Sequence, residues 1–445
     1  MQNLEGFPFQ SLRFDRNGRA QAGAGIDALI AHARSSDATD AILLAHGFRN
    51  SEAEALTLYS KLLESFRLHL RRPEIKSALH ERRFVVGGIL WPSKAFREAD
   101  DFERGGTQGL DDVAAEREDI RARLLALRND ASPDARSQID RAAALLPSLE
   151  NNPGAQNEFV DLVLSVLVES EDDPTEGLQQ VRAQTGSELL DKLAIPIVVP
   201  TAGPDGEGGV AAVGEAPPMS GEALGVEEVF MTIAGRVGLL LNLTTWYLMK
   251  ERSAVVGAAG VADAVRRLKA DRPDIKVHLV GHSLGARLMA STAKALCAAP
   301  AVKADSLILL EGAFSHYGFA SNNGRGTPGF FRDVVARHII KGPIVATHSL
   351  EDTVVGKAYA LASRLAGDNT KAVGDASDPF GGIGRNGAQL TTESSAGILR
   401  EPGTPYAFTS GAVNNLDGSG GLISDHGDVT NPAVTYALAC AVART

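Results

Sequence analysis

The sequence predicts an α/β protein built on a mostly parallel β-sheet that is flanked by helices on both faces. Short apolar runs recur along the chain, and segments with the 3.6-residue period of a helix lie between several of them. These runs are almost continuously apolar, which is typical of strands buried on both faces of a parallel sheet. The chain has 445 residues, of which 44% are hydrophobic, so it is long and apolar enough for a large core.

Each strand is expected where an apolar run is bounded by turn residues or polar residues. Residues 9–15 predict an edge strand that turns at Asn17-Gly18. The core strands are expected at Ala41–Ala45, Phe84–Trp91, Val277–Val280, Ser306–Leu310, Ile344–Thr347 and Tyr406–Thr409. Helical periodicity predicts helices at Ala286–Ala299 and Pro432–Ala443.

A long insertion separates two parts of the expected core. About 185 residues lie between the second core strand and Val277, far more than one crossover needs. We therefore divide the chain into residues 1–97, an insertion of residues 98–227, and residues 228–445. The insertion begins with helical patterns, and its residues 201–226 form a Gly/Pro-rich stretch that predicts a mobile loop. A helical pattern resumes at Glu227 and continues to about Ala270.

Charge is concentrated in the insertion. The formal net charge of the chain is −11, and residues 98–200 hold 9 Lys and Arg against 22 Asp and Glu, or −13. An acidic segment repels phosphate backbones, so no nucleic-acid partner is expected, and a solvated helical surface is the simplest interpretation.

The sequence gives no sign of secretion or of a membrane span. The first twenty residues lack the apolar block of a signal peptide, so a cytoplasmic location is expected. The most apolar later run, Val237–Met249, has 13 residues, whereas a span needs about 20. It is interpreted as a buried helix or as an interfacial helix that contacts lipid. The two cysteines, Cys297 and Cys440, lie in apolar helical runs and are expected in the core.

The stretch VGHSLGA places Ser283 between Gly281 and Gly285, directly after an expected strand and before an expected helix. In a Gly-x-Ser-x-Gly turn the chain reverses so sharply that the serine hydroxyl is exposed, and glycine avoids collisions on either side. This is the only match to the pattern in the chain. We therefore predict that Ser283 is a nucleophile.

A serine nucleophile needs a base, and the base needs an acid that orients it. Asp352 follows the expected strand Ile344–Thr347 by five residues, and His426 is the one histidine after Asp352. The order serine, acid, histidine is that of nucleophile-elbow hydrolases. Asp352 as a helix cap remains an alternative, as does Glu311 as the acid, in which case His316 or His348 would be candidate bases.

An oxyanion formed at the substrate needs backbone N–H donors. One is expected from Leu284, after the nucleophile, and the other from Phe48 in the loop AHGFRN, where Gly47 allows close approach. His46, Gly47, His282 and Trp91 are expected near the substrate. A packing role for Trp91 and a role for His282 in shaping the turn are the alternatives.

The motifs LLAHGF, VGHSLGA, HSLEDTVV and HGDV together resemble the α/β-hydrolase superfamily, in particular bacterial serine esterases and lipases. The resemblance covers Ala41–Leu90 and Trp246 to the C-terminus. The stretches GILWPSK and WYLMKERSAVVG are similar to a poorly characterised bacterial group in that superfamily. The resemblance implies the α/β-hydrolase fold, a Ser283–His426–Asp352 relay, an acyl-enzyme intermediate, no cofactor, and an insertion that caps the active site.

Two other patterns carry less weight. Gly382–Gly387 matches Gly-x-Gly-x-x-Gly, but no strand precedes it and no helix follows it, so a loop is expected. No Cys or His pair has zinc-site spacing, and no metal is expected.

The sequence favours a carboxylic-ester hydrolase acting on a small-molecule or lipid ester. A thioesterase, a membrane-acting phospholipase and a non-catalytic binding protein that keeps the hydrolase fold remain alternatives.

Overall fold

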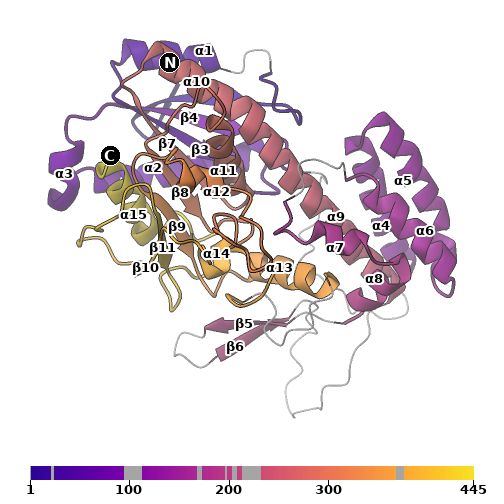
Figure 1. Cartoon of the computed structure of the whole chain (residues 1–445). Coiled ribbons are helices and arrows are strands. Elements are labelled where there is room, and N and C mark those ends of the chain that lie inside the picture. Colours follow the sequence, from indigo (N-terminus) through magenta and orange to yellow (C-terminus); the bar gives the residue numbers. More distant parts are fainter. Residues whose placement is uncertain are drawn as a thin grey trace.

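A nine-stranded β-sheet forms the centre of the protein in a computed structural model (Figure 1). The structure describes residues 2–21, 25–94, 113–167, 173–195, 198–202, 208–212, 232–366 and 375–445. The strand order is β1-β2-β4-β3-β7-β8-β9-β11-β10, and every neighbouring pair is parallel except β1 with β2. The strands are β1 (Gln2–Leu4), β2 (Phe7–Arg13), β3 (Asp40–Ala45), β4 (Phe84–Leu90), β7 (Lys276–His282), β8 (Ser306–Leu310), β9 (Ile344–His348), β10 (Ser394–Ile398) and β11 (Val413–Asp417).

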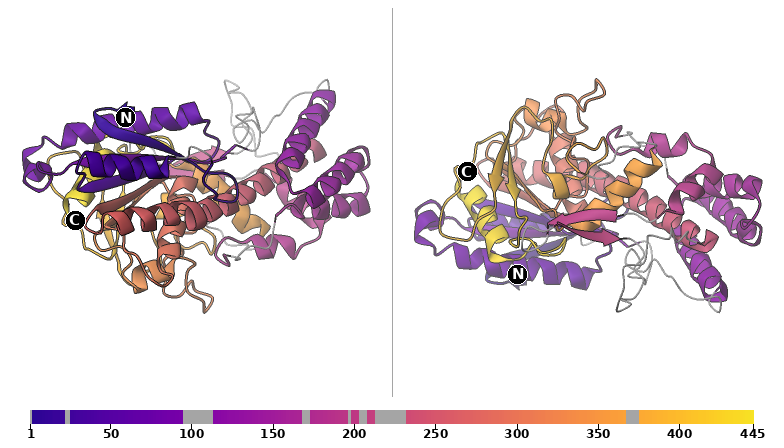
Figure 2. Two further views of the ribbon diagram at one scale, coloured as in Figure 1. Left: turned by 90° about the horizontal axis from the view of Figure 1, so that it is seen from above. Right: turned by 90° about the horizontal axis from the view of Figure 1, so that it is seen from below.

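Helices cover both faces of this sheet, as Figure 2 shows. One face packs against α2 (Glu52–His69), α3 (Pro73–Leu79) and α15 (Pro432–Ala443), and the core there includes Cys440. The other face packs against α1 (Ile26–Ser35), α10 (Ala262–Asp271) and α11 (Leu284–Leu296), and its core includes Cys297. Both cysteines are buried and free. The predicted α/β class with a mostly parallel sheet is therefore confirmed.

The expected strands near residues 41, 84, 277, 306 and 344 are all present. The expected first strand is β2, but it is not an edge because β1 pairs with its outer side. The prediction of a strand at Tyr406–Thr409 is wrong. That segment has no regular structure; instead, the Tyr406 and Phe408 rings stack 4.9 Å apart and belong to the core beside α15.

The strand that takes this place, β11, was missed because two asparagines lie at its centre. The Asn414 amide group donates hydrogen bonds to the carbonyls of Ile344, Thr409 and Ala412. Asn415 exchanges hydrogen bonds with the backbone of Ala388. Buried amides are tolerated when they are hydrogen-bonded, so polar side chains here fix the neighbouring loops to the strand.

A long helical segment precedes β7. Helix α9 (Ile233–Val255) continues through a π-helical stretch, η3 (Val256–Val261), into α10. Most side chains of Val237–Met249 are buried in the core, so the buried-helix interpretation is confirmed and this run offers no apolar face to lipid. Of the described helices, none combines the length and apolar character needed to cross a bilayer.

The helices of the insertion lie beside α9, at a distance from the sheet (Figure 1). Helices α4 (Val113–Asp130), α6 (Pro153–Leu164) and α8 (Gly186–Leu193) contact α9. Part of the Gly/Pro-rich stretch that predicted a loop instead belongs to an antiparallel pair of strands, β5 (Val198–Ala202) with β6 (Gly208–Ala212), while residues 203–207 and 213–226 lie outside the described residues. The helices here are α4 (Val113–Asp130), α5 (Pro133–Leu145), η2 (Leu146–Ser148), α6 (Pro153–Leu164), α7 (Leu178–Arg182) and α8 (Gly186–Leu193).

The remaining helices in the C-terminal half of the described chain are α12 (Arg332–Ala336), α13 (Thr353–Leu365) and α14 (Ile383–Asn386). Helix α14 occupies the Gly-x-Gly-x-x-Gly segment, so the prediction of a loop there is wrong. The Gly384 amide donates to Gly312 and the Gly384 carbonyl accepts from Ser349, which places this helix at the carboxyl ends of β8 and β9.

Close packing between η3 and α11 depends on one glycine. A Cβ built on Gly257 would lie 2.1 Å from the carbonyl oxygen of Leu288, whereas a Cβ on Gly238 of α9 would meet nothing within 4 Å. We expect Gly257→Ala to lower the free energy of unfolding by about 2–3 kcal/mol, because the helices must separate. Gly238→Ala should leave stability unchanged or raise it by up to about 1 kcal/mol. Urea denaturation of both variants measures this, and equal stabilities would contradict it.

Candidate active site

Ser283 makes the turn between β7, which ends at His282, and α11, which begins at Leu284. Its backbone has φ 58° and ψ −124°, in a region that non-glycine residues rarely adopt. Two hydrogen bonds hold this conformation: the Ser283 amide donates to Leu310 at 3.0 Å, and its carbonyl accepts from Ala313 at 3.1 Å. The strained turn is thus fixed by backbone contacts with the end of β8 and the loop that follows it.

Glycines surround the serine because backbone atoms occupy the space of a Cβ. A Cβ on Gly281 would lie 2.2 Å from the Gly285 carbonyl oxygen, and one on Gly285 would lie 2.3 Å from the Ala45 carbonyl oxygen. A Cβ on Gly47 would lie 2.7 Å from Cβ of Ser283. These three approaches bring the end of β3, the turn and the first residues of α11 together.

Asp352 and His426 form a hydrogen-bonded pair beside this turn. The imidazole Nδ1 of His426 donates to Oδ2 of Asp352 at 2.8 Å. The other oxygen, Oδ1, accepts from the amide of Val355 at 2.9 Å and caps α13. The sequence left open whether Asp352 contacts His426 or caps a helix, and the structure shows both contacts, made through different oxygens.

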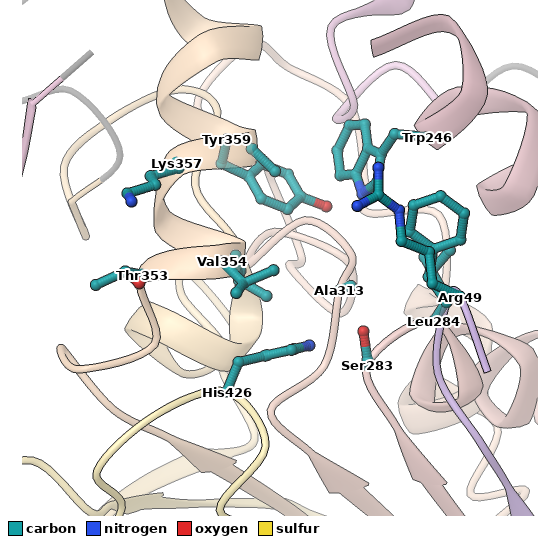
Figure 3. Close-up of a pocket in the computed structure, with 13 residues that line it drawn as sticks. Arg49, Trp246, Ser283, Leu284, Ala313, Thr353, Val354, Lys357, Tyr359 and His426 are labelled. Atoms are coloured by element: carbon teal, nitrogen blue, oxygen red, sulfur yellow. The ribbon is translucent and has the colours of Figure 1, made fainter. Parts of the chain in front are cut away.

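The pKa of His426 is raised although its ring is buried. Burial disfavours the charged ring, but the Asp352 carboxylate outweighs burial and raises the pKa of His426 above its usual 6.5. Within the described chain His426 is hydrogen-bonded to Asp352 and His282, and not to Ser283. Figure 3 shows the Ser283 hydroxyl and the His426 ring directed into the same space.

His282 supports the loop that carries His426. Its Nε2 donates to the backbone carbonyl of His426 at 2.8 Å, and the two ring centroids are 4.8 Å apart. Burial, and then the neighbouring His426, lowers the pKa of His282 to about 3, so the ring is neutral. His282 does not line the pocket, and its contact with His426 favours the alternative of a residue that shapes the site.

The loop after β3 brings Phe48 to the pocket that Ser283 lines. Phe48 and Leu284 both line the pocket. No hydrogen bond within the described residues uses the Phe48 amide, and the Leu284 amide, at the first position of α11, has no acceptor inside the helix. Both expected oxyanion donors are therefore available next to Ser283.

His46 and Trp91 pack beneath this loop. Trp91 Nε1 donates to the His46 carbonyl at 3.0 Å, and the two rings stack with centroids 5.6 Å apart. The His46 ring donates through Nδ1 to the Gly47 carbonyl, and burial lowers its pKa to about 4. Neither side chain lines the pocket, because both are turned into the core, 1% and 5% exposed respectively. The packing alternative for Trp91 is thus the one the structure supports.

The pocket encloses about 290 Å³ and is mainly apolar. Figure 3 shows Trp246 and Tyr359 opposite Ser283, with Val354 of α13 between Tyr359 and His426. None of its lining residues comes from the described part of the insertion. The lining residues are Phe48, Arg49, Trp246, Ser283, Leu284, Ala313, Thr353, Val354, Val355, Lys357, Ala358, Tyr359 and His426.

The residues from α13 were missed by sequence reasoning, although a signal existed. Val354, Val355, Ala358 and Tyr359 recur at the spacing of one helical face and begin directly after Asp352. If Asp352 lies beside the expected nucleophile, a helix that starts at Asp352 also starts near it, so the first turns of that helix were candidates for the pocket wall. Trp246 belongs to the stretch WYLMKERSAVVG that was noted only for its resemblance.

Trp246 and Tyr359 form an aromatic wall of the pocket, and a buried ionic cluster contacts both of them. We define this cluster as Asp173, Glu176, Lys250 and Arg287; the Tyr359 hydroxyl is hydrogen-bonded to it. Lys250 pairs with Glu176 and donates to the Tyr359 hydroxyl at 2.8 Å, and its Nζ lies 3.9 Å from the Trp246 ring centroid. Arg287 reaches both carboxylates at 3.2 Å. The four charged side chains are at most 6% exposed.

Opposite charges compensate for burial within the ionic cluster. Burial raises the pKa of a carboxyl, yet Lys250 and Arg287 reverse this and lower the pKa of Glu176. Burial lowers the pKa of Lys250 to about 8, despite Glu176. Glu176 belongs to the insertion, whereas Lys250 and Arg287 belong to α9 and α11. The cluster therefore joins the insertion to the helices that carry the pocket wall.

Comparison with protein-family models, curated proteins and solved structures finds no match for this chain.

The three histidines near the site should titrate differently. By ¹⁵N NMR, His426 should have a midpoint above pH 6.5, and Asp352→Asn should lower it because the stabilising carboxylate is lost. His282 and His46 should stay neutral from pH 5 to 8, with pKa values of about 3 and about 4. Because the folded-state pKa of His426 is raised, its pairing adds stability that is fully present below pH 6.5 and is lost as pH rises through that pKa. A His426 midpoint that Asp352→Asn does not change would contradict the prediction.

Removing one member of the ionic cluster should destabilise the protein strongly. We expect Glu176→Ala to cost about 3–5 kcal/mol, because Lys250 and Arg287 would remain buried without their main partner. The control is Arg141→Ala, which removes an ion pair with Glu158 whose side chains are 62% and 47% exposed, and should cost less than about 1 kcal/mol. Thermal or urea unfolding compares them, and similar losses would refute the assignment.

Proposed function

We propose that this protein is a serine hydrolase that cleaves carboxylic esters through an acyl-enzyme intermediate. The observation that carries the proposal is that Ser283, which has a strained backbone, and His426, which is bonded to Asp352, line the same apolar pocket. Ser283 and His426 face the same space, and Asp352 holds the ring of His426 through Nδ1. This orientation leaves Nε2 to accept a proton.

The proposed reaction has two halves. Ser283 Oγ attacks the acyl carbonyl while His426 Nε2 takes its proton, and the amides of Phe48 and Leu284 stabilise the oxyanion. His426 then gives the proton to the departing alcohol, which leaves the acyl group on Ser283. Water attacks this ester, again with His426 as base, and the acid is released. Closure of the Ser283–His426 hydrogen bond accompanies substrate binding, since catalytic hydrogen bonds are often long without substrate.

The order of strands and catalytic groups supports an α/β-hydrolase fold. The nucleophile follows β7, the acid follows β9, and the histidine follows β11, in the chain order of that superfamily. The loop after β3 supplies an oxyanion donor in that superfamily, and Phe48 occupies this position here.

The pocket favours esters with an apolar acyl group of moderate size. Its walls are mostly apolar and its volume is about 290 Å³. A thioester would meet the same groups. Membrane docking through Val237–Met249 loses support because that segment is buried.

A fluorophosphonate probe tests the proposal. The wild type should be labelled covalently and Ser283→Ala should not, because the probe reacts with an activated serine. Ser291→Ala is a matched control on the same helix: its buried hydroxyl lies outside the pocket, so labelling should persist. With p-nitrophenyl esters of increasing acyl length, Ser283→Ala should lower kcat by at least about 10⁴-fold.

Equal labelling of the wild type and Ser283→Ala would exclude Ser283 as the nucleophile. Absence of labelling in the wild type would favour a non-catalytic binding protein. Labelling without turnover of any ester would direct the search to thioesters.

A further inference from the structure

The charged side chains that line the pocket carry positive charge. Among the described lining residues, Arg49 and Lys357 are cationic, His426 gains a positive charge when it is protonated, and none is an aspartate or a glutamate. The chain as a whole has a formal net charge of −11, so the pocket differs in sign from the rest of the protein. Charges of one sign in a cleft with apolar walls attract ligands of the opposite sign. The proposed mechanism uses neither Arg49 nor Lys357.

Arg49 has a strained backbone that neighbouring residues hold in place. Its φ is 62°, in the left-handed region that residues other than glycine seldom occupy. The Arg49 amide donates to the Ser93 carbonyl at 3.0 Å, and the Asn50 amide donates to the Ser93 hydroxyl at 3.2 Å. That hydroxyl donates in turn to the Asn50 carbonyl at 2.9 Å. Glycine would adopt this conformation without strain, so an arginine at this position indicates a role for its side chain.

The side chain of Arg49 is directed along the wall of the pocket. Its guanidinium carbon lies 5.1 Å from the centroid of the Phe48 ring. Figure 3 shows the Arg49 guanidinium group on the side of the pocket where Trp246 lies. A guanidinium group that packs on an aromatic face can still donate hydrogen bonds in its own plane, where its fork of N–H groups matches the two oxygens of a carboxylate.

The position of Arg49 indicates which half of the ester it would meet. In the proposed reaction His426 gives a proton to the departing alcohol, so the alcohol lies beside His426. Figure 3 shows Arg49 and His426 on opposite sides of Ser283, which places Arg49 where the acyl group would extend. Lys357 belongs to α13, and its ammonium group is directed away from Ser283 in the same view. Arg49 is therefore the cation that faces the acyl group.

We propose that Arg49 binds a carboxylate at the far end of the acyl group, so that the substrates are monoesters of dicarboxylic acids. This inference rests on the proposed ester hydrolysis at Ser283. The apolar walls of the pocket fit the methylene chain between the two carbonyl carbons, and Arg49 pairs with the charge at its end. Hydrolysis of such an ester consumes one water and releases an alcohol and a dicarboxylate.

Two matched esters test this specificity. Monomethyl glutarate and methyl pentanoate differ at the end of the acyl chain, where one has a carboxylate and the other a methyl group. The wild type should have the higher kcat/KM for monomethyl glutarate. Arg49→Gln should lower the ratio of the two kcat/KM values by about 10- to 100-fold, because a hydrogen bond to a charged group is lost.

Arg400→Gln is the matched control, since Arg400 also lies over an aromatic ring, 5.7 Å from the Tyr406 centroid, but does not line the pocket. It should leave the ratio unchanged. A wild type that does not prefer monomethyl glutarate would overturn the proposal. So would an Arg49→Gln variant that loses activity equally on both esters, or a larger fall in the ratio for Lys357→Gln than for Arg49→Gln.

Calorimetry tests the same contact without turnover. Ser283→Ala should bind monomethyl glutarate at least about tenfold more tightly than Ser283→Ala combined with Arg49→Gln. Equal affinities, or no binding to Ser283→Ala, would overturn the proposal. Failure of the proposed function is distinguished by a wild type that the fluorophosphonate does not label, because the difference in affinity does not depend on an active Ser283.

Discussion

The site depends on direct backbone contact between the end of β3, the turn at Ser283 and the start of α11, with no side chain between them. Strands β3 and β7 are parallel neighbours with Ala45 opposite Gly281, so the segments that follow them emerge at one point of the sheet. Gly285 allows α11 to begin against the Ala45 carbonyl, and Gly47 lies against Ser283. A methyl group at either glycine would separate α11 from the loop after β3. The same separation would move the Phe48 and Leu284 amides apart, so packing and the geometry of the proposed oxyanion site depend on the same contacts.

Asp352 connects the site around Ser283 to the wall of the pocket. One of its oxygens fixes the His426 ring and the other fixes the start of α13. Since α13 carries Val354 and Tyr359, one side chain sets both the position of the proposed base, His426, and the shape of the pocket. An N-cap contributes about 1 kcal/mol to helix stability, so a helix role alone is enough to keep an oxygen acceptor at this position. The second oxygen is what makes a carboxylate preferable to serine or asparagine.

Local patterns in the sequence were sufficient for the parts of the fold and site that depend on neighbouring residues. The turn at Ser283, the strands that are apolar throughout and helix α15 could all be predicted because burial and glycine requirements are visible within a few residues. Strand β11 was not, because Asn414 and Asn415 become suitable for burial only through bonds to carbonyls of other segments. Trp91 illustrates the same limit: its strand was predicted, but which face of the site its ring would occupy depends on His46.

The acidic insertion shows what charge alone does not reveal. Its net charge of −13 over residues 98–200 suggested a solvated surface, yet Asp173 and Glu176 from that segment are buried against Lys250 and Arg287. Glu176 lies 74 positions from Lys250 and 111 from Arg287, so no local pattern joins them. Buried charges lose much of their hydration and are stable only when their partners are in place, so this contact tolerates little displacement. Because Lys250 and Glu176 also hold the Tyr359 hydroxyl, docking of the insertion positions an aromatic wall of the pocket, although no described residue of the insertion lines that pocket.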